Sequence, residues 1–114
     1  VAVPMKEEAL DAVTALSGSG PAYVFYLLEA MLDAAKEMGL PDFESRKLAL
    51  ATVKGAADLM CESGEDAAVL RARVTSPGGT TEAALDELER AGVKDAVISA
   101  MQAAERRSKE LAGD

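Results

Sequence analysis

The sequence has no histidine, no tryptophan and a single cysteine among its 114 residues. The lack of histidine excludes a histidine general base, a Ser-His-Asp triad and a histidine-ligated metal, and we expect no metal site. A lone thiol, Cys61, cannot form a disulfide within the chain. This favours a reducing compartment, so we expect a cytoplasmic protein. No apolar run reaches the roughly 18 residues that a membrane span requires.

Basic residues are also scarce, with 12 Lys and Arg against 20 Asp and Glu, which gives a formal net charge of −8. This balance argues against nucleic acid or an anionic membrane as a partner, because both select a basic surface. Apolar residues make up 49% of the chain and aromatics only 4%. A core built from Ala, Leu, Val and Met therefore favours helices that approach each other closely.

The apolar residues recur at helical spacing, and no segment alternates as a strand would. The pattern predicts an all-α fold of about six helices. The expected helices cover residues 6–16, 21–38, 43–63, 66–74, 80–91 and 93–112. The stretch SGSGP, from Ser17 to Pro21, is expected to break the chain between the first two helices.

The third expected helix is apolar or small over nearly its whole surface between Leu48 and Met60. Lys54 and Asp58, its strongly polar residues in that stretch, share one narrow stripe. A helix of this kind must be covered on nearly all sides. The pattern favours burial against a second chain, and the alternative is a central helix in a compact monomeric bundle.

Two glycine-containing stretches are candidate binding sites. GSGPAY, from Gly18 to Tyr23, resembles a dinucleotide-binding fingerprint. Tyr23 occupies the third glycine position, however, and no strand precedes the stretch. A purely structural role between two helices is therefore the preferred interpretation.

The second stretch, TSPGGTTEAAL from Thr75 to Leu85, is compatible with an anion site and equally with an ordinary helix cap. Two glycines after Pro77 can direct successive backbone amides into one concavity, and the following helix adds its free N-terminal amides. The hydroxyl groups that surround this concavity belong to Ser76, Thr80 and Thr81. A carboxylate or phosphate would suit such a place. The alternative is an ordinary helix cap, with Thr80 as N-cap and Glu82 in the first turn.

Several of these segments together resemble the C-terminal domain of pyrroline-5-carboxylate reductases, from about Met5 to the end of the chain. The segments are LSGSGPAYVFYLLEAM, KEMGLP, GAADLM and VTSPGGTTEAALDEL. The residues that match the family signature around the last segment are Leu70, Val74, Thr75, Ser76, Gly78, Gly79, Thr81, Ala84, Leu85, Leu88 and Glu89.

The resemblance implies reduction of the cyclic imine 1-pyrroline-5-carboxylate to L-proline, the last step of proline biosynthesis. It also implies an interlocked helical dimerisation domain. Ser76 and the amides of Gly78, Gly79, Thr80 and Thr81 would bind the substrate carboxylate, and Thr81 would act catalytically through a hydrogen bond to the ring nitrogen. The resemblance leaves open which nearby acid approaches the site. The three candidates are Glu62, Glu65 and Asp66.

The same resemblance implies that residues 1–5 end a linker from an N-terminal Rossmann domain absent from this chain, and that residues 6–114 form the helical domain. NADPH or NADH would bind mainly to the absent domain, so the chain alone is expected to bind no cofactor and to be inactive. The expected partners are a second copy, in a homodimer or a ring of dimers, and the small-molecule substrate. The alternative is a stand-alone, non-catalytic helical oligomerisation module, and the reading frame upstream of Val1 distinguishes the two.

Overall fold

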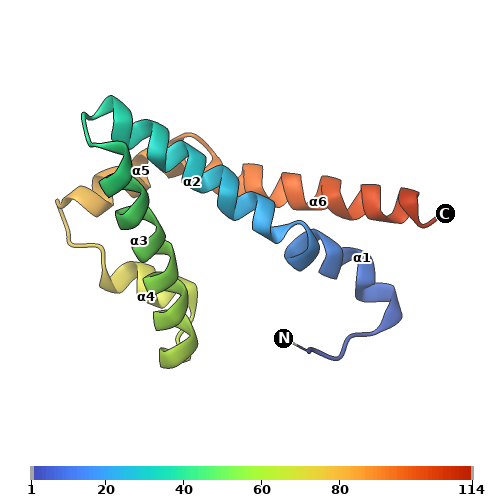
Figure 1. Cartoon of the computed structure of the whole chain (residues 1–114). Helices are drawn as coiled ribbons and strands as arrows, with labels where there is room; N and C mark the ends of the chain where they lie inside the picture. The colour runs from blue at the N-terminus through green and yellow to red at the C-terminus, as the bar shows by residue number, and fades with distance from the viewer. Residues whose placement is uncertain (1, 114) are drawn as a thin grey trace. The chain divides into compact units, whose positions relative to one another are not determined.

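The computed structural model describes residues 2–113, which form six α-helices and no strand (Figure 1). The all-α prediction is confirmed, and the predicted third helix is correct to within one residue. Two short helices of other types, η1 (Glu7–Ala9, 3₁₀) and η2 (Thr14–Gly18, π), flank the first α-helix. The α-helices are α1 (Leu10–Val13), α2 (Gly20–Glu37), α3 (Asp42–Ser63), α4 (Ala67–Arg73), α5 (Thr80–Arg90) and α6 (Val93–Leu111).

The chain divides into two compact units. Unit 1 comprises the residues up to Phe25 together with those from Leu88 onward, and it contains η1, α1, η2 and α6. Unit 2 comprises Tyr26–Glu87 and contains α3 and α4. The boundaries fall within α2 and α5, so each of these helices contributes residues to both units.

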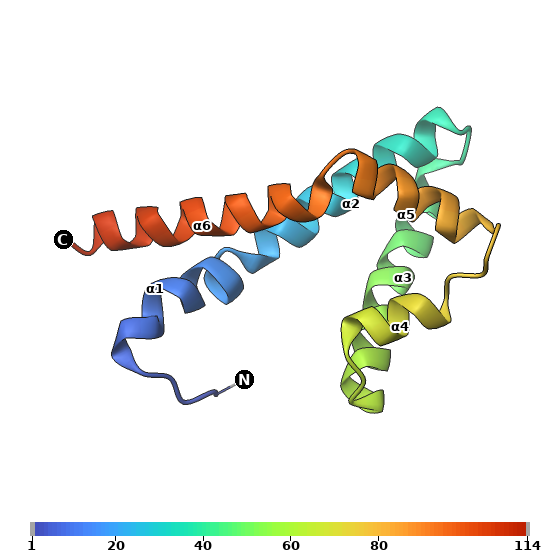
Figure 2. The ribbon, with the colours of Figure 1, turned by 180° about the vertical axis from the view of Figure 1, so that it is seen from behind.

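Unit 1 is held together by α6, which runs alongside α1 and η2 (Figures 1 and 2). Ala15 on η2 is its most buried residue, only 2% exposed, and its small side chain allows the helices to come close. A side-chain hydrogen bond joins the two ends of the chain, because the Ser108 hydroxyl donates to Asp11 Oδ1 at 2.7 Å across 97 positions.

The junction between α1 and α2 differs from the expected break over Ser17–Pro21. The chain instead stays helical through η2, where the Ser19 amide donates to the Thr14 carbonyl at 2.8 Å, a five-residue spacing. Within the expected stretch from Ser17 to Pro21, only Ser19 lies outside a helix. The wider turn is stabilised by Tyr23, whose hydroxyl donates to the carbonyl of Ala15 at 2.7 Å. The predicted break is therefore confirmed at Ser19, and it is shorter than expected because a π-turn keeps Ser17 and Gly18 helical.

Unit 2 buries little of its apolar surface. Among its described residues only Ser45 and Ala49, both on α3, are buried. Leu48, the first residue of the nearly all-apolar stretch, is 62% exposed. The large apolar side chains that α3 leaves exposed are Phe43, Leu48, Leu50, Leu59 and Met60. The described chain does not cover this helix, as expected if a second chain does.

Candidate functional site

The candidate anion-binding motif, residues 75–85, begins with a tight turn between α4 and α5. The Gly79 amide donates to the carbonyl of Ser76 at 3.0 Å, so the turn runs from Ser76 to Gly79 with Pro77 second and Gly78 third. Gly78 has φ of +74°, which is characteristic of the third position of a type II turn. Pro77 fixes φ at the second position, where a type II turn favours proline.

Both glycines are required, for different reasons. A side chain at Gly78 would be strained, because its φ lies in the left-handed region. At Gly79 a Cβ atom would lie 3.2 Å from the carbonyl oxygen of Ser76, closer than ordinary van der Waals contact. The pair of glycines thus lets the chain turn close to Ser76 before it enters α5.

Helix α5 begins directly after the turn. Its first main-chain bond runs from the Ala83 amide to the Gly79 carbonyl at 3.3 Å, so Gly79 is the N-cap and Thr80 the first helical residue. The alternative with Thr80 as N-cap is therefore wrong, whereas the expected start of the helix at Thr80 is confirmed.

The predicted site residues are contiguous, and the turn brings their polar groups to one helix end. Ser76 and Thr80 are exposed, and Thr81 is half-buried. The hydroxyl groups of these three residues make no hydrogen bond to any other residue in the range 2–113. Free hydroxyls beside the positive end of a helix dipole can donate to an anion.

Glu82 also belongs to this site. Its Oε1 atom accepts a hydrogen bond from the Gly78 amide at 3.1 Å, and its side chain is half-buried. The sequence placed Glu82 only in the first helical turn. Its spacing of three residues after the N-cap matches that of a capping box, in which a glutamate reaches back to an amide before the helix. That spacing was the available signal for this contact.

The three candidate acids before the motif have different surroundings. Glu65 accepts a hydrogen bond from Arg73 at 3.0 Å, and the same pair forms a salt bridge. Arg73 is the last residue of α4, so the pair ties the turn before α4 to the segment that enters the motif. Glu62 and Asp66 are exposed, and Asp66 makes no side-chain cap to α4.

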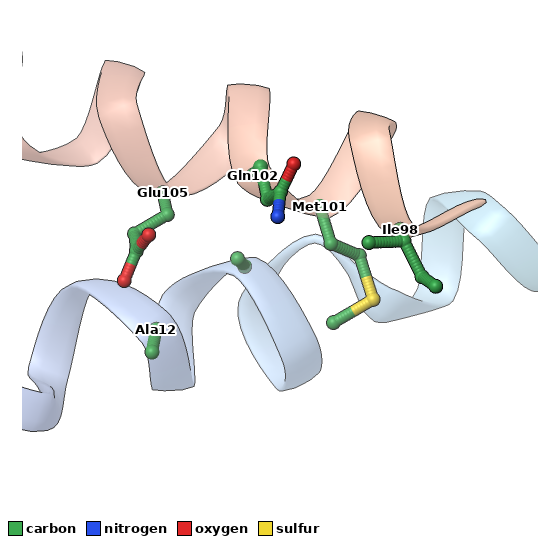
Figure 3. A pocket seen from close by; sticks show the side chains of 6 residues that line it. Ala12, Ile98, Met101, Gln102 and Glu105 are labelled. Carbon is green, nitrogen blue, oxygen red and sulfur yellow. The ribbon is translucent and has the colours of Figure 1, made fainter. Parts of the chain in front are cut away.

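A separate cavity of about 240 Å³ lies within unit 1, between α1 and η2 on one side and α6 on the other. Figure 3 shows Ile98, Met101 and Glu105 directed from α6 toward the opposite helices. The lining residues are Ala12, Ala15, Ile98, Met101, Gln102 and Glu105. One acid and one amide give this mainly apolar hollow little means of orienting a polar substrate.

The described part of the chain offers no group of three or more His, Cys, Asp or Glu side chains suited to a metal ion. It also contains no helix long and apolar enough to cross a membrane. GSGPAY lies on η2 and the start of α2, without the strand that a dinucleotide-binding turn follows. The motif before α5 is therefore the site that the geometry supports best.

Comparison with known proteins shows the family to which the chain belongs. The family model described as pyrroline-5-carboxylate reductase dimerisation matches residues 7–111. A pyrroline-5-carboxylate reductase of Corynebacterium melassecola is 50% identical over 105 residues, which cover 92% of this chain and 39% of that protein. The Arabidopsis thaliana reductase is 47% identical, with 92% of this chain and 38% of the relative covered. The chain thus spans about two fifths of the length of these relatives.

Solved structures show the same correspondence. Plasmodium falciparum pyrroline carboxylate reductase, with NADP bound, matches with a TM-score of 0.90 and 38% identity, covering 93% of this chain and 43% of that one. The Streptococcus pyogenes 1-pyrroline-5-carboxylate reductase matches with a TM-score of 0.91 and 33% identity, covering 95% of this chain and 42% of that one. The chain therefore belongs to the pyrroline-5-carboxylate reductase dimerisation family.

Proposed function

We propose that these residues form the dimerisation and substrate-binding part of a pyrroline-5-carboxylate reductase. The observation that carries the proposal is the turn from Ser76 to Gly79, because it leads into a helix end that suits a carboxylate. This turn lies within residues 7–111, which the family model matches. The reaction is reduction of the carbon–nitrogen double bond of 1-pyrroline-5-carboxylate, which yields L-proline. A domain of this size would supply the interface and the substrate pocket.

In this proposal the substrate carboxylate lies at the start of α5. Ser76 and the amides of Gly78 and Gly79 would hold it, with the amides of Thr80 and Thr81 completing the set. The unbonded hydroxyls and the positive helix end support this assignment. A carboxylate fixed at one end of a small ring orients the whole ring, which is most of what the chemistry asks of the protein.

Thr81 is proposed to hydrogen-bond the ring nitrogen, which must carry a proton when hydride reaches the adjacent carbon. Thr81 is half-buried in the first turn of α5, and its hydroxyl bonds to no other residue in the described range. A free hydroxyl at this position can accept from the protonated imine. A protonated imine is a better hydride acceptor than a neutral one, so a positioned acceptor favours the reaction.

Of the three acids, Glu65 is the one we propose to approach the site. Its side chain pairs with Arg73, the last residue of α4, and the motif begins shortly after Arg73. Glu62 and Asp66 lack a comparable connection among the described residues.

A nicotinamide cofactor would supply the hydride when bound. Residues 2–113 contain no strand that leads through a glycine turn into a helix, so we assign none of them to the nucleotide. We propose instead that NADPH or NADH binds to a separate Rossmann domain and that residues 1–5 end the linker from it. The bound NADP of the Plasmodium falciparum relative supports the cofactor class.

The proposed partner is a second copy of the chain, interlocked through α3. The family description and the exposed apolar side chains of that helix support this assembly. A cytoplasmic location is also part of the proposal and rests on the single free thiol, Cys61.

The test of the proposed function is an assay of the protein in its full natural length with 1-pyrroline-5-carboxylate and NADPH, followed by absorbance of the nicotinamide. We expect imine-dependent oxidation of NADPH and formation of L-proline in equal amounts. Oxidation at the rate of buffer alone would refute the reductase assignment.

A further inference from the structure

Glu82 is the one acidic side chain that the described structure places on the amides of the motif. Its carboxylate accepts from the Gly78 amide at 3.1 Å. That amide is also one of those assigned to the substrate carboxylate. Two carboxylates cannot both accept from one amide at full strength, and their like charges repel at close range.

We propose that Glu82 is an internal competitor for the substrate carboxylate, so that it weakens ground-state binding at its own site. This inference rests on the proposed function. In the free protein the Glu82 side chain satisfies the Gly78 amide. When substrate enters, the side chain moves away and the incoming carboxylate takes the amide in its place.

The position of Glu82 makes the exchange feasible. Glu82 is on α5, and its long side chain reaches back four residues to Gly78 outside the helix. The residue is only half-buried, so the released carboxylate can turn to solvent without moving the backbone. The type II turn is closed separately, by the Gly79 amide and the Ser76 carbonyl, and remains intact during the exchange.

The alternative is that Glu82 only caps α5. The two roles make opposite predictions for removal of the side chain. A cap stabilises the helix, so its loss would lower stability and leave carboxylate binding the same or weaker. A competitor opposes the ligand, so its loss would strengthen binding of a carboxylate ligand and would not strengthen binding of a ligand without a carboxylate.

The experiment measures dissociation constants of L-proline and of pyrrolidine, which lacks the carboxylate, by calorimetry on the full-length protein. We expect Glu82→Ala to bind L-proline roughly two- to tenfold more tightly than the parent, the range of one hydrogen bond of ordinary net strength. Pyrrolidine binding should be unchanged or weaker. Glu82→Gln keeps an acceptor for the Gly78 amide without the charge, so its gain should be smaller.

Asp86→Asn is the matched control. Asp86 is exposed and lies one turn further along α5, and its substitution removes one negative charge from the same helix. We expect it to bind L-proline as the parent does. An equal gain in Asp86→Asn, or no gain in either Glu82 variant, would overturn the proposal.

The outcome also separates this inference from the proposed function. A parent protein that reduces 1-pyrroline-5-carboxylate, and whose Glu82 variants show no tighter binding of L-proline, would sink the Glu82 proposal alone. A parent protein that neither reduces the imine nor binds L-proline would remove the proposed function, and the Glu82 proposal with it. If Glu82→Ala does not fold, Glu82→Gln decides the matter.

Discussion

The hydroxyl of Tyr23 donates a hydrogen bond of 2.7 Å to the carbonyl oxygen of Ala15, the most buried residue of unit 1. We expect Tyr23→Phe to lower the free energy of unfolding by about 1–2 kcal/mol, because the Ala15 carbonyl loses its side-chain donor. Urea denaturation at fixed protein concentration measures the change. Tyr26→Phe is the control, because Tyr26 is 77% exposed and its hydroxyl bonds to no residue within 2–113. Equal stability of the two variants would deny Tyr23 this role.

Gly78→Ala tests the turn before α5. We expect a loss of about 1–2 kcal/mol of stability, because alanine must adopt the left-handed φ that Gly78 has. The substrate carboxylate should also bind more weakly, since the amides would shift. Gly20→Ala is the matched control, because an added Cβ there meets nothing within 4 Å and φ is not left-handed. Thermal unfolding and L-proline titration of both variants would decide. A fully stable Gly78→Ala would mean that the turn tolerates a side chain.

Thr81→Ala tests the proposed hydrogen bond to the ring nitrogen. We expect kcat/KM for 1-pyrroline-5-carboxylate to fall by roughly 10–100-fold in the full-length protein, on the scale of one positioned hydrogen bond. Thr81→Ser retains the hydroxyl and should recover most of the rate. An unchanged rate in Thr81→Ala would remove this side chain from the pocket.

Leu59→Asp tests the proposed interface between two copies of the chain through α3. Leu59 is exposed on α3, and a charge there would be buried against the second copy. We expect the dimer dissociation constant to rise by at least roughly tenfold, since burial of one leucine contributes about 1.5–3 kcal/mol. Light scattering after size exclusion, over a hundredfold dilution, measures it.

Lys54→Gln serves as the control for that substitution. Lys54 lies on the polar stripe of α3 and pairs with Asp58 at 2.8 Å on the surface, where such pairs contribute little. A parent chain that is monomeric at every concentration would contradict the proposed interface through α3.

The 114 residues made by themselves provide the fifth prediction. We expect them to fold and dimerise without reducing 1-pyrroline-5-carboxylate, because the described part has no strand–turn–helix unit to hold a nicotinamide. Absorbance of NADPH with the imine present measures this. Turnover well above the buffer rate would contradict it.

Helical spacing was enough to predict the fold class and α3, because apolar periodicity and the turn residues around it act locally. The exposure of Leu48 is consistent with the expected need for cover from outside the chain. The π-turn of η2 before Ser19 was not predictable in this way. It depends on the reach of Tyr23 back to Ala15, which is a contact between side chain and backbone and leaves no periodic trace.

The site shows the same division. The glycine pair and the hydroxyls were visible in the sequence, and the turn from Ser76 to Gly79 brings them together. The expected start of α5 at Thr80 is correct, and only its N-cap differs, because Gly79 rather than Thr80 occupies that position. The Glu82 contact with Gly78 was missed although its capping-box spacing was visible, since a solvent-facing rotamer is compatible with the same spacing.

Because each chain buries few residues by itself, stable folding of a newly synthesised chain is expected to depend on association with a second copy. Only Ala15, Ser45 and Ala49 are buried among the described residues, so the monomer is expected to have low stability before it associates. We therefore expect folding to follow second-order kinetics and the unfolding midpoint to climb with protein concentration. The monomer is then the form that chaperones and proteases bind, and its lifetime is expected to depend on how fast synthesis supplies a second copy.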